Sequence, residues 1–468
     1  MEVAFWRRAA TAVGSWTPEQ RDTVVYASAA AFALGTMRLS SIQIYQQWAE
    51  IAIGPYVLAT VLSLLTVRRA ARRRDEMLRA VPADGSTHTR SGIRGIRLSN
   101  VRVGIFLFVL IGSTLLPLTL EVFLQSQTGG TSHVQPEVLV VERSGRLVAL
   151  GKDPYGIVTG KKLTGQAAIA MRGQPAYDEY DPYGPLMALF GLPSSLHASP
   201  KITDARVYFS LVSVMLVAIA LALCRGSSEP RLLALQGMTV LPTAALPMAT
   251  AGDDLPVAAV LLLGMFFLHR RRPLAGGLML GFAAGLKFTA WPLVLLAFLV
   301  ARDQEGRRGR GTAWLAAGMA AVLVPSVLPL FIQNPTSFLD NVVRFPLGLG
   351  KIGSPAASAL PGHILVTMFP QIKHVLPVAL CVGAVVIMSW VLVKHRPRTV
   401  SDVCRLGGWL MTAGILFAPA TRVGYLLYPI NFFIWSWLIR CEEDAEVYQE
   451  ANDVVTNAAT AGRSPIAA

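Results

Sequence analysis

The chain has 468 residues, of which 53% are apolar and only 15% are charged, and its formal net charge at pH 7 is +14. Soluble proteins carry about a quarter charged residues, so this composition excludes a soluble enzyme, a disordered chain and a basic nucleic-acid-binding protein. The apolar residues form blocks long enough to cross a hydrocarbon core of ~30 Å. The sequence therefore predicts an all-α, polytopic integral membrane protein.

Twelve apolar runs are candidate transmembrane helices, the first of which is interpreted as a retained helix because no cleavage pattern follows it. They lie at residues 23–39, 51–67, 103–122, 206–224, 232–249, 255–269, 274–288, 289–301, 313–332, 375–393, 406–420 and 424–439. The runs 274–288 and 289–301 are short and meet at Lys287. This arrangement indicates two tilted helices or a broken pair that meets near one membrane face.

Arginine and lysine are concentrated in the loops on one side of these runs. The basic loops are 68–102, 225–231, 270–272, 302–310 and 394–405. Because cytoplasmic loops carry the excess of basic residues, this side and both termini are expected to be cytoplasmic, in a cell membrane.

Four regions follow from this topology. They are two spans and a basic cytoplasmic loop in 1–102, a core with a long outer loop (123–205) in 103–345, a second outer segment with the C-terminal spans in 346–440, and a flexible cytoplasmic tail in 441–468.

The acidic residues of the outer side are clustered. They are Glu137, Glu142, Asp153, Asp178, Glu179, Asp181 and Asp204 in the first outer loop, with Asp253 and Asp254 in a short turn. The spans contain almost no ionisable residue at mid-depth, which argues against a secondary transporter with coupling residues at the midplane. Any chemistry is therefore expected on the outer side.

Residues 136–155 have the spacing of a short amphipathic surface helix. Val140, Val141, Ser144, Leu147 and Val148 share one stripe, and Gly151 fits the helix end. Glu137 falls in the first turn, where the helix dipole favours a carboxylate. A helix-start carboxylate without a catalytic role is the alternative to a functional one.

Residues 177–186 form a loop rich in tyrosine, proline and carboxylates, with Asp181 and Tyr183 near its end. Rings and carboxylates together suit a sugar, because rings stack on its C–H faces and carboxylates accept its hydroxyl hydrogens. The alternative is that the tyrosines lie at the bilayer boundary, where this residue is common.

Three pieces in this order resemble the GT-C membrane glycosyltransferases, in particular glycosyltransferase family 87. They are Glu137 to Tyr155, Tyr183-Gly184-Pro185-Leu186, and the run from Arg270 to Phe288 that contains Pro273-Leu274-Ala275-Gly276-Gly277 and Gly285-Leu286-Lys287. The resemblance covers roughly residues 103–345. The sequence departs from the family in having Glu137 where an Asp is usual, and in two additional spans before the core.

The resemblance implies an inverting transfer of a sugar, mannose or arabinofuranose, from a polyprenyl-phosphate donor to a lipid or glycan acceptor on the extracytoplasmic side. The family includes actinobacterial polyprenol-phosphate transferases, and the high Ala, Gly and Arg content agrees with such a source. Glu137 is the candidate base. Asp153 is the alternative base. The third possibility is that activity has been lost, because Glu137 stands where the family usually has Asp.

The remaining candidate residues would bind substrate. Tyr155, Asp181 and Tyr183 are candidates for the sugar, and Asp153 or Asp181 for a divalent ion, although carboxylates alone do not establish a metal site. Lys287 is the candidate ligand of the donor phosphate, and Asp253 and Asp254 are further substrate-binding candidates. An ion pair with these two aspartates is the alternative role of Lys287. Arg143, Arg344 and Lys351 are further phosphate candidates, with a solvated surface role as the alternative.

No cofactor is identified, since the chain has neither a Walker-type phosphate loop nor a dinucleotide fingerprint. His133, His197, His363 and His374 lack metal-ligand spacing. The expected partners are the donor, the acceptor and membrane lipids, with no nucleic acid. A lipid or glycan transporter and an inactive membrane scaffold are the competing functions.

Overall fold

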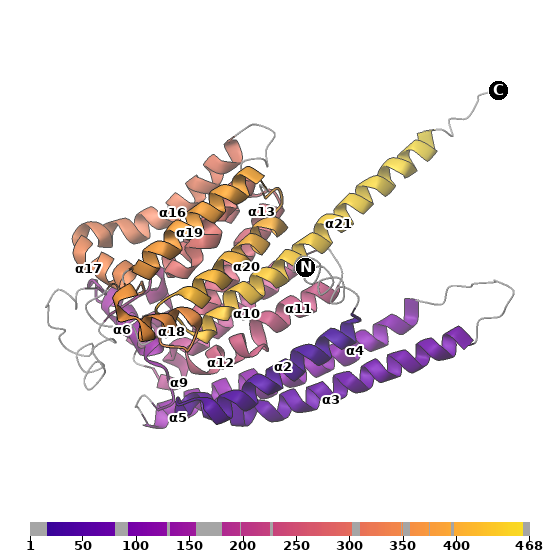
Figure 1. Cartoon of the computed structure of the whole chain (residues 1–468), viewed down its shortest axis with the longest axis horizontal. Helices are drawn as coiled ribbons and strands as arrows, with labels where there is room; N and C mark the ends of the chain where they lie inside the picture. The colour runs from indigo at the N-terminus through magenta and orange to yellow at the C-terminus, as the bar shows by residue number, and fades with distance from the viewer. Residues whose placement is uncertain are drawn as a thin grey trace. The chain divides into compact units, whose positions relative to one another are not determined.

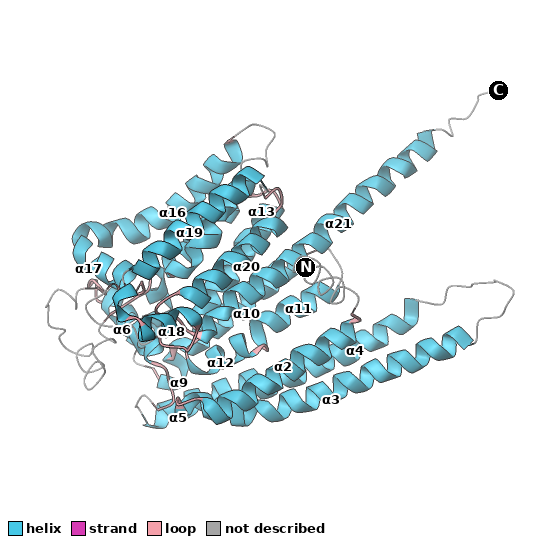
Figure 2. Cartoon of the chain, viewed as in Figure 1, coloured by secondary structure: helices cyan, strands magenta, loops and turns pink. Residues whose placement is uncertain are grey.

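A computed structural model describes residues 16–79, 92–128, 132–155, 180–196, 198–224, 228–301, 309–347, 349, 356–373, 375–394 and 397–461. Throughout these residues the regular structure is helical, and β-pairing is limited to two isolated bridges (Figures 1 and 2). The all-α prediction is confirmed.

Six helices among the described residues are long and apolar enough to cross a membrane. They are Gln43–Arg72, Asn100–Thr128, Ala205–Leu223, Glu229–Thr250, Arg310–Gln333 and Val400–Phe417, and four shorter apolar helices are Asp254–His269, Pro273–Leu286, Phe288–Ala301 and Val375–Val391. The chain is thus a membrane protein. Each of the twelve predicted runs falls mainly on helix, while the number of twelve spans stays a prediction.

The chain divides into two compact units, Met1–Gln135 with Thr239–Ala251 (unit 1) and Pro136–Met238 with Gly252–Ala468 (unit 2). Unit 1 contains α2 (Pro18–Leu39), α3 (Gln43–Arg79), α4 (Gly92–Val109), the π-helix η1 (Leu110–Leu115), α5 (Leu116–Thr128) and α12 (Pro242–Thr250). The two N-terminal helices that the resemblance left unexplained therefore belong to this unit, where α2 packs along α3.

A proline and a helix break leave backbone carbonyls of unit 1 without a helical donor. Side chains donate hydrogen bonds to these carbonyls. Pro117 has no N–H, so the Ser113 carbonyl loses its helical donor, and the Trp48 indole donates to it at 2.9 Å. At the break between α11 and α12, Thr114 donates to the Thr239 carbonyl at 2.9 Å and Tyr56 donates to the Val240 carbonyl at 2.5 Å. Such pairing is required where no water reaches the backbone.

Unit 2 contains the remaining helices. They are α6 (Pro136–Ala149), η4 (Pro185–Met187), α8 (Ala188–Gly191), η5 (Leu192–Ser195), α9 (Pro200–Thr203), α10 (Ala205–Leu223), α11 (Ser228–Thr239), α13 (Asp254–His269), α14 (Pro273–Leu286), η6 (Phe288–Ala290), α15 (Trp291–Ala301), α16 (Arg310–Gln333), α17 (Pro335–Leu339), η7 (Asp340–Arg344), α18 (Pro361–Met368), η8 (Pro370–Ile372), α19 (Val375–Lys394), α20 (Val400–Phe417), η9 (Val423–Leu426) and α21 (Leu427–Ala461).

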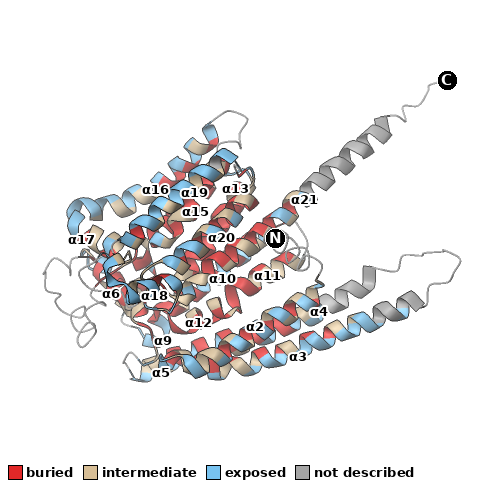
Figure 3. Cartoon of the chain, viewed as in Figure 1, coloured by how far each residue is buried: buried red, intermediate tan, exposed pale blue. Residues whose placement is uncertain are grey.

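Helix α13 lies in the core of unit 2. Apart from Phe267, its residues from Leu255 to Leu268 are buried, and it packs against α10, α14 and α21. A helix that is apolar on all sides is stable only when it is surrounded. By contrast, much of α16 and α19 is exposed (Figure 3). Their exposed apolar side chains include Val324, Ile332, Val382 and Trp390, as expected of helices that face lipid.

Close packing of α14 on α16 depends on glycine. A Cβ at Gly277 would lie 2.2 Å from the Leu315 carbonyl oxygen, and one at Gly318 would lie 2.4 Å from the Leu274 carbonyl oxygen. Small residues let helices approach to backbone contact in a membrane, where packing rather than hydrophobicity drives association. The Gly-rich run 276–285 therefore fixes α14, and with it the residue that follows, Lys287.

The amphipathic segment folds as predicted. It forms α6, and Gly151 ends it with φ +65°, while Val140, Val141, Ser144 and Leu147 of the predicted stripe are buried. Val148 is the exception, at 37% exposed. Gly145 of α6 touches Gly191 of α8, where a Cβ on Gly145 would meet the Gly191 carbonyl carbon at 2.1 Å, so α6 is held directly on the loop that follows Tyr183.

The C-terminal helix extends beyond the last predicted span. α21 continues through the acidic residues after Arg440 to Ala461, so most of the predicted tail 441–468 is helical and only residues 462–468 lie outside the described part of the chain.

Candidate functional site

Lys287 lies at a break between two short apolar helices, which confirms the broken pair. Its backbone is extended (φ −156°, ψ 145°) after the end of α14, and it forms an isolated antiparallel bridge with Tyr183. The Gly184 N–H donates to the Leu286 carbonyl at 2.8 Å. A Cβ at Gly184 would meet the Gly285 carbonyl oxygen at 2.1 Å, so glycine is needed where the outer loop joins the helix break.

The Lys287 ammonium forms two ion pairs. Its Nζ is 2.6 Å from Asp253 Oδ2 and 2.7 Å from Asp254 Oδ1. The three side chains are between 7% and 13% exposed, so desolvation makes the pairing important to the fold. The ion pair that the sequence offered as the alternative role of Lys287 is therefore present, and its role in phosphate binding stays a prediction.

Aromatic residues surround this ion pair. Lys287 Nζ lies 5.3 Å from the Tyr183 ring centroid and 5.5 Å from that of Tyr425, within the range of cation–π attraction. The Tyr428 hydroxyl donates to Asp254 Oδ1 at 2.7 Å. The tyrosine and lysine singled out in two distant parts of the sequence are thus in contact.

Glu137, in the first turn of α6, lies beside the same tyrosine. Its Oε1 forms an ion pair with the Arg422 guanidinium, and the two side chains are 17% and 26% exposed. Its Oε2 is buried and has no hydrogen-bond partner among the described residues. Burial raises the pKa of the Tyr183 phenol well above its usual value, and the charges of Asp253 and Glu137 raise it further, so Tyr183 lies within electrostatic range of both acidic groups.

We call Glu137, Tyr183, Asp253, Asp254, Lys287, Arg422, Tyr425 and Tyr428 the outer cluster, after the membrane side that the sequence predicts for it. All of them belong to unit 2. The sequence identified the first five and missed Arg422, Tyr425 and Tyr428, which lie on the short segment before and at the start of α21. The signal was present in the sequence, because Arg422 is one of the few cations in the predicted outer loops.

The other predicted residues form a second, buried group. The Ser144 hydroxyl donates to Asp181 Oδ2 at 2.5 Å, and the Tyr183 N–H donates to its Oδ1 at 3.2 Å. The Tyr155 hydroxyl donates to the Tyr183 carbonyl at 2.8 Å. Burial raises the pKa of Asp181 to about 6, although the Ser144 hydroxyl and the Arg143 charge oppose the shift. These hydrogen bonds hold the backbone of Tyr183 in place.

Arg143 and Asp153 also lie with this group. Arg143 is 0% exposed, so the solvated role suggested for it is wrong, because its guanidinium is buried near the Asp181 carboxylate. Asp153 accepts the Tyr155 N–H at 2.9 Å, as a turn-forming aspartate does. Its carboxylate is partly exposed, and its role as a base is untested.

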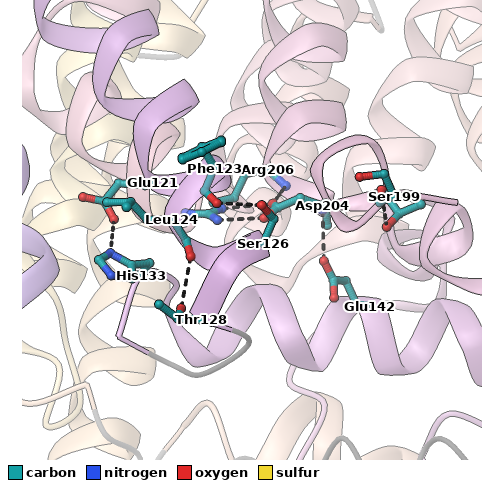
Figure 4. Close-up of polar contacts among 12 residues, drawn as sticks. Glu121, Phe123, Leu124, Ser126, Thr128, His133, Glu142, Ser199, Asp204 and Arg206 are labelled. Atoms are coloured by element: carbon teal, nitrogen blue, oxygen red, sulfur yellow. Dashed lines mark hydrogen bonds and ion pairs between the residues drawn. The ribbon is translucent and has the colours of Figure 1, made fainter.

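A third acidic group anchors α6 to the start of α10. Asp204 caps α10 and pairs with Arg206 at 2.7 Å, and Glu142 accepts the Ala205 N–H at 3.2 Å (Figure 4). Burial raises the pKa of Glu142 to about 7, and the Asp204 charge adds to the shift. The helix that carries Glu137 is thus fixed at a second point.

The remaining predicted residues are outside these groups. Arg344 is 52% exposed and pairs with Asp340 at 2.5 Å, in keeping with the solvated role. Asp178, Glu179, His197, Lys351 and His374 lie outside the described residues. Over the part of the chain that the structure describes, no group of three or more His, Cys, Asp or Glu could hold a metal ion.

The comparison with known protein families gives a match over part of the chain. A model of glycosyltransferase family 87 matches residues 182–419, just over half of the chain. The chain belongs to glycosyltransferase family 87. It is therefore a membrane glycosyltransferase. Neither a curated protein nor a solved structure matches it.

The extent of this match differs from the motif resemblance, which covered roughly 103–345. The family 87 match includes Tyr183, Asp253, Asp254 and Lys287 but begins after Glu137 and ends before Arg422. Glu137 and Arg422 therefore lie outside the matched residues. The fold of unit 2, and not the family match, brings them into the outer cluster.

Proposed function

We propose that this family 87 member has a GT-C-like architecture and transfers one sugar, mannose or arabinofuranose, from a polyprenyl-phosphate donor to a lipid or glycan acceptor, with inversion. The proposed site is the outer cluster, on the extracytoplasmic side of a cell membrane. The topology has twelve spans and cytoplasmic termini, as the distribution of basic residues favours.

The observation that supports this proposal most is the environment of Glu137. One carboxylate oxygen is paired with Arg422, while the other is buried without a hydrogen-bond partner among the described residues. A buried unsatisfied acceptor is costly, and it is expected where a ligand supplies the donor. An acceptor hydroxyl that donates to Oε2 would satisfy it, which favours Glu137 over a purely structural helix-start carboxylate.

The reaction requires one proton transfer and one displacement. The acceptor oxygen attacks the anomeric carbon as Glu137 takes the hydroxyl proton, and the bond from that carbon to the phosphate oxygen breaks with its electron pair. Polyprenyl phosphate leaves. A positioned general base of this kind contributes about 10²- to 10⁴-fold, and cations near the departing phosphate stabilise its charge.

The neighbours of Glu137 suit the sugar. The rings of Tyr183 and Tyr425 both lie within 5.5 Å of the Lys287 ammonium, and rings of this kind stack on the C–H faces of a sugar. Asp253 and Asp254 are already paired with Lys287, so they are poorer candidates for the base. No metal is required by this scheme, because the cationic side chains supply the positive charge.

The proposal is tested with purified protein in lipid nanodiscs and synthetic polyprenyl phosphates that carry radiolabelled mannose or arabinofuranose. Label is expected to appear in an extractable lipid or glycan acceptor, with the anomeric configuration inverted by NMR. Nucleotide sugars are offered in parallel. Transfer from a nucleotide sugar alone would overturn the donor class, and retention of configuration would overturn the single-displacement mechanism.

A further inference from the structure

We infer that Arg422, rather than Lys287, is the main ligand of the donor phosphate, and that phosphate binding draws Arg422 away from Glu137 and so frees that carboxylate for the acceptor hydroxyl. This inference rests on the proposed function. It assigns a binding role to a residue beyond the family match, and it makes the Glu137–Arg422 ion pair the resting state of the site.

The backbone around Arg422 is fixed, which limits any rearrangement to its side chain. The preceding residue, Thr421, forms a parallel bridge with Ala357, and its N–H donates to the Ala356 carbonyl at 2.9 Å. On the other side, the Val423 N–H donates to Ser358 Oγ at 3.1 Å. The guanidinium therefore extends from a held position and exchanges partners by rotating its own side chain.

The two cations of the outer cluster differ in their exposure and in the carboxylates that they pair with. Lys287 contacts two carboxylates and is 10% exposed, whereas Arg422 pairs with Glu137 and is 26% exposed. An incoming phosphate would have to compete with both buried aspartates for Lys287. Arg422 is the more accessible of the two cations to such a phosphate.

Guanidinium chemistry fits this role. Arginine presents five N–H donors in a planar fork and binds phosphate oxygens through two parallel bonds. When the phosphate takes over the guanidinium, the Glu137 carboxylate loses its ion-pair partner and can accept the hydrogen bond of the acceptor hydroxyl.

The test measures binding of an unglycosylated polyprenyl phosphate to the protein in nanodiscs, with the corresponding polyprenol as the phosphate-free control. Arg422→Gln is expected to weaken polyprenyl phosphate binding at least about tenfold, the loss of a charge-assisted bond, and Arg422→Lys is expected to restore part of it. Polyprenol binding is expected to be unchanged in both variants. Arg344→Gln is the matched control, because this arginine is 52% exposed and pairs with Asp340 instead of Glu137.

The Glu137→Gln variant distinguishes this inference from a purely structural Glu137–Arg422 ion pair. Because it removes the competitor for the guanidinium, we expect Glu137→Gln to tighten polyprenyl phosphate binding severalfold. Equal phosphate binding by wild type, Arg422→Gln and Glu137→Gln, with all three folded by size-exclusion and thermal unfolding, overturns the inference while leaving the proposed function intact. A wild-type protein that binds no polyprenyl phosphate overturns both.

Discussion

Tyr183 and Lys287 pair across an antiparallel bridge, and the Lys287 ammonium lies 5.3 Å from the centroid of the Tyr183 ring. This bridge joins the end of the first outer loop to the break between α14 and α15. The same tyrosine is supported by Asp181 and Tyr155 on its backbone. The position of the outer cluster therefore depends on a backbone contact as much as on its charged side chains.

Gly184→Ala is predicted to lower sugar transfer without changing any functional side chain. The new Cβ would lie 2.1 Å from the Gly285 carbonyl oxygen, so the segment that carries Tyr183 must move away from Lys287. We expect a loss of about tenfold or more, since small displacements of positioned groups are expensive in catalysis. Gly424→Ala is the control, because nothing lies within 4 Å of its added Cβ, and equal activity of the two variants would contradict the prediction.

Lys287→Met is predicted to destabilise the protein strongly. It leaves Asp253 and Asp254 buried next to each other without their cation, and removing one member of a buried ion pair costs about 3–5 kcal/mol. A lower thermal unfolding midpoint in detergent is the expected observation, with partial recovery when Asp253→Asn is added. Lys394→Met, at an exposed position, should be neutral. A Lys287→Met midpoint like that of wild type would show that the ion pair contributes little.

Gly277→Ala is predicted to weaken the packing of α14 against α16. The added methyl would meet the Leu315 carbonyl oxygen at 2.2 Å, and overpacking of this kind costs about 1–3 kcal/mol. Gly383→Ala in α19 has open space around its Cβ and should be neutral or slightly stabilising, because alanine is the better helix former. Thermal unfolding of the two variants compares them directly, and the reverse order would be inconsistent with the packing described.

The buried Glu142 predicts a pH dependence of stability. Its pKa is raised from 4.5 to about 7, by burial first and then by Asp204, so the folded state holds a proton that the unfolded state has lost between these pH values. Stability is therefore expected to fall as the pH rises from about 4.5 to 7, by at most about 3 kcal/mol from this group.

Glu142→Gln is expected to flatten this slope, and Glu50→Gln, at an exposed position, should leave it unchanged. Unfolding midpoints measured from pH 4.5 to 8 test the prediction. If wild type became more stable relative to Glu142→Gln as the pH rises across this range, the prediction would be contradicted.

Local sequence signals predicted the elements that depend on neighbouring residues. Gly151 marked the end of α6, and the apolar runs that meet at Lys287 predicted the helix break. The sequence also placed the acidic pair at Asp253 and Asp254 level with that lysine. Each of these features depends on periodicity, turn chemistry or charge distribution within a short stretch.

Features that depend on long-range contacts were not predicted. Arg143 was expected at the surface, and it is buried because Asp181 lies beside it. Arg422 and Tyr425 join the outer cluster through the fold, which brings the segment before α21 to the start of α6. No local pattern specifies such a meeting.

The most direct test of the account is the rate of sugar transfer from a polyprenyl-phosphate donor by Glu137→Gln, with Glu142→Gln on the same helix as the control. We predict that Glu137→Gln loses about 10²- to 10⁴-fold in transfer while it stays folded and still binds polyprenyl phosphate, and that Glu142→Gln remains active. Transfer by Glu137→Gln within a few-fold of wild type would contradict the assignment of Glu137 as the base.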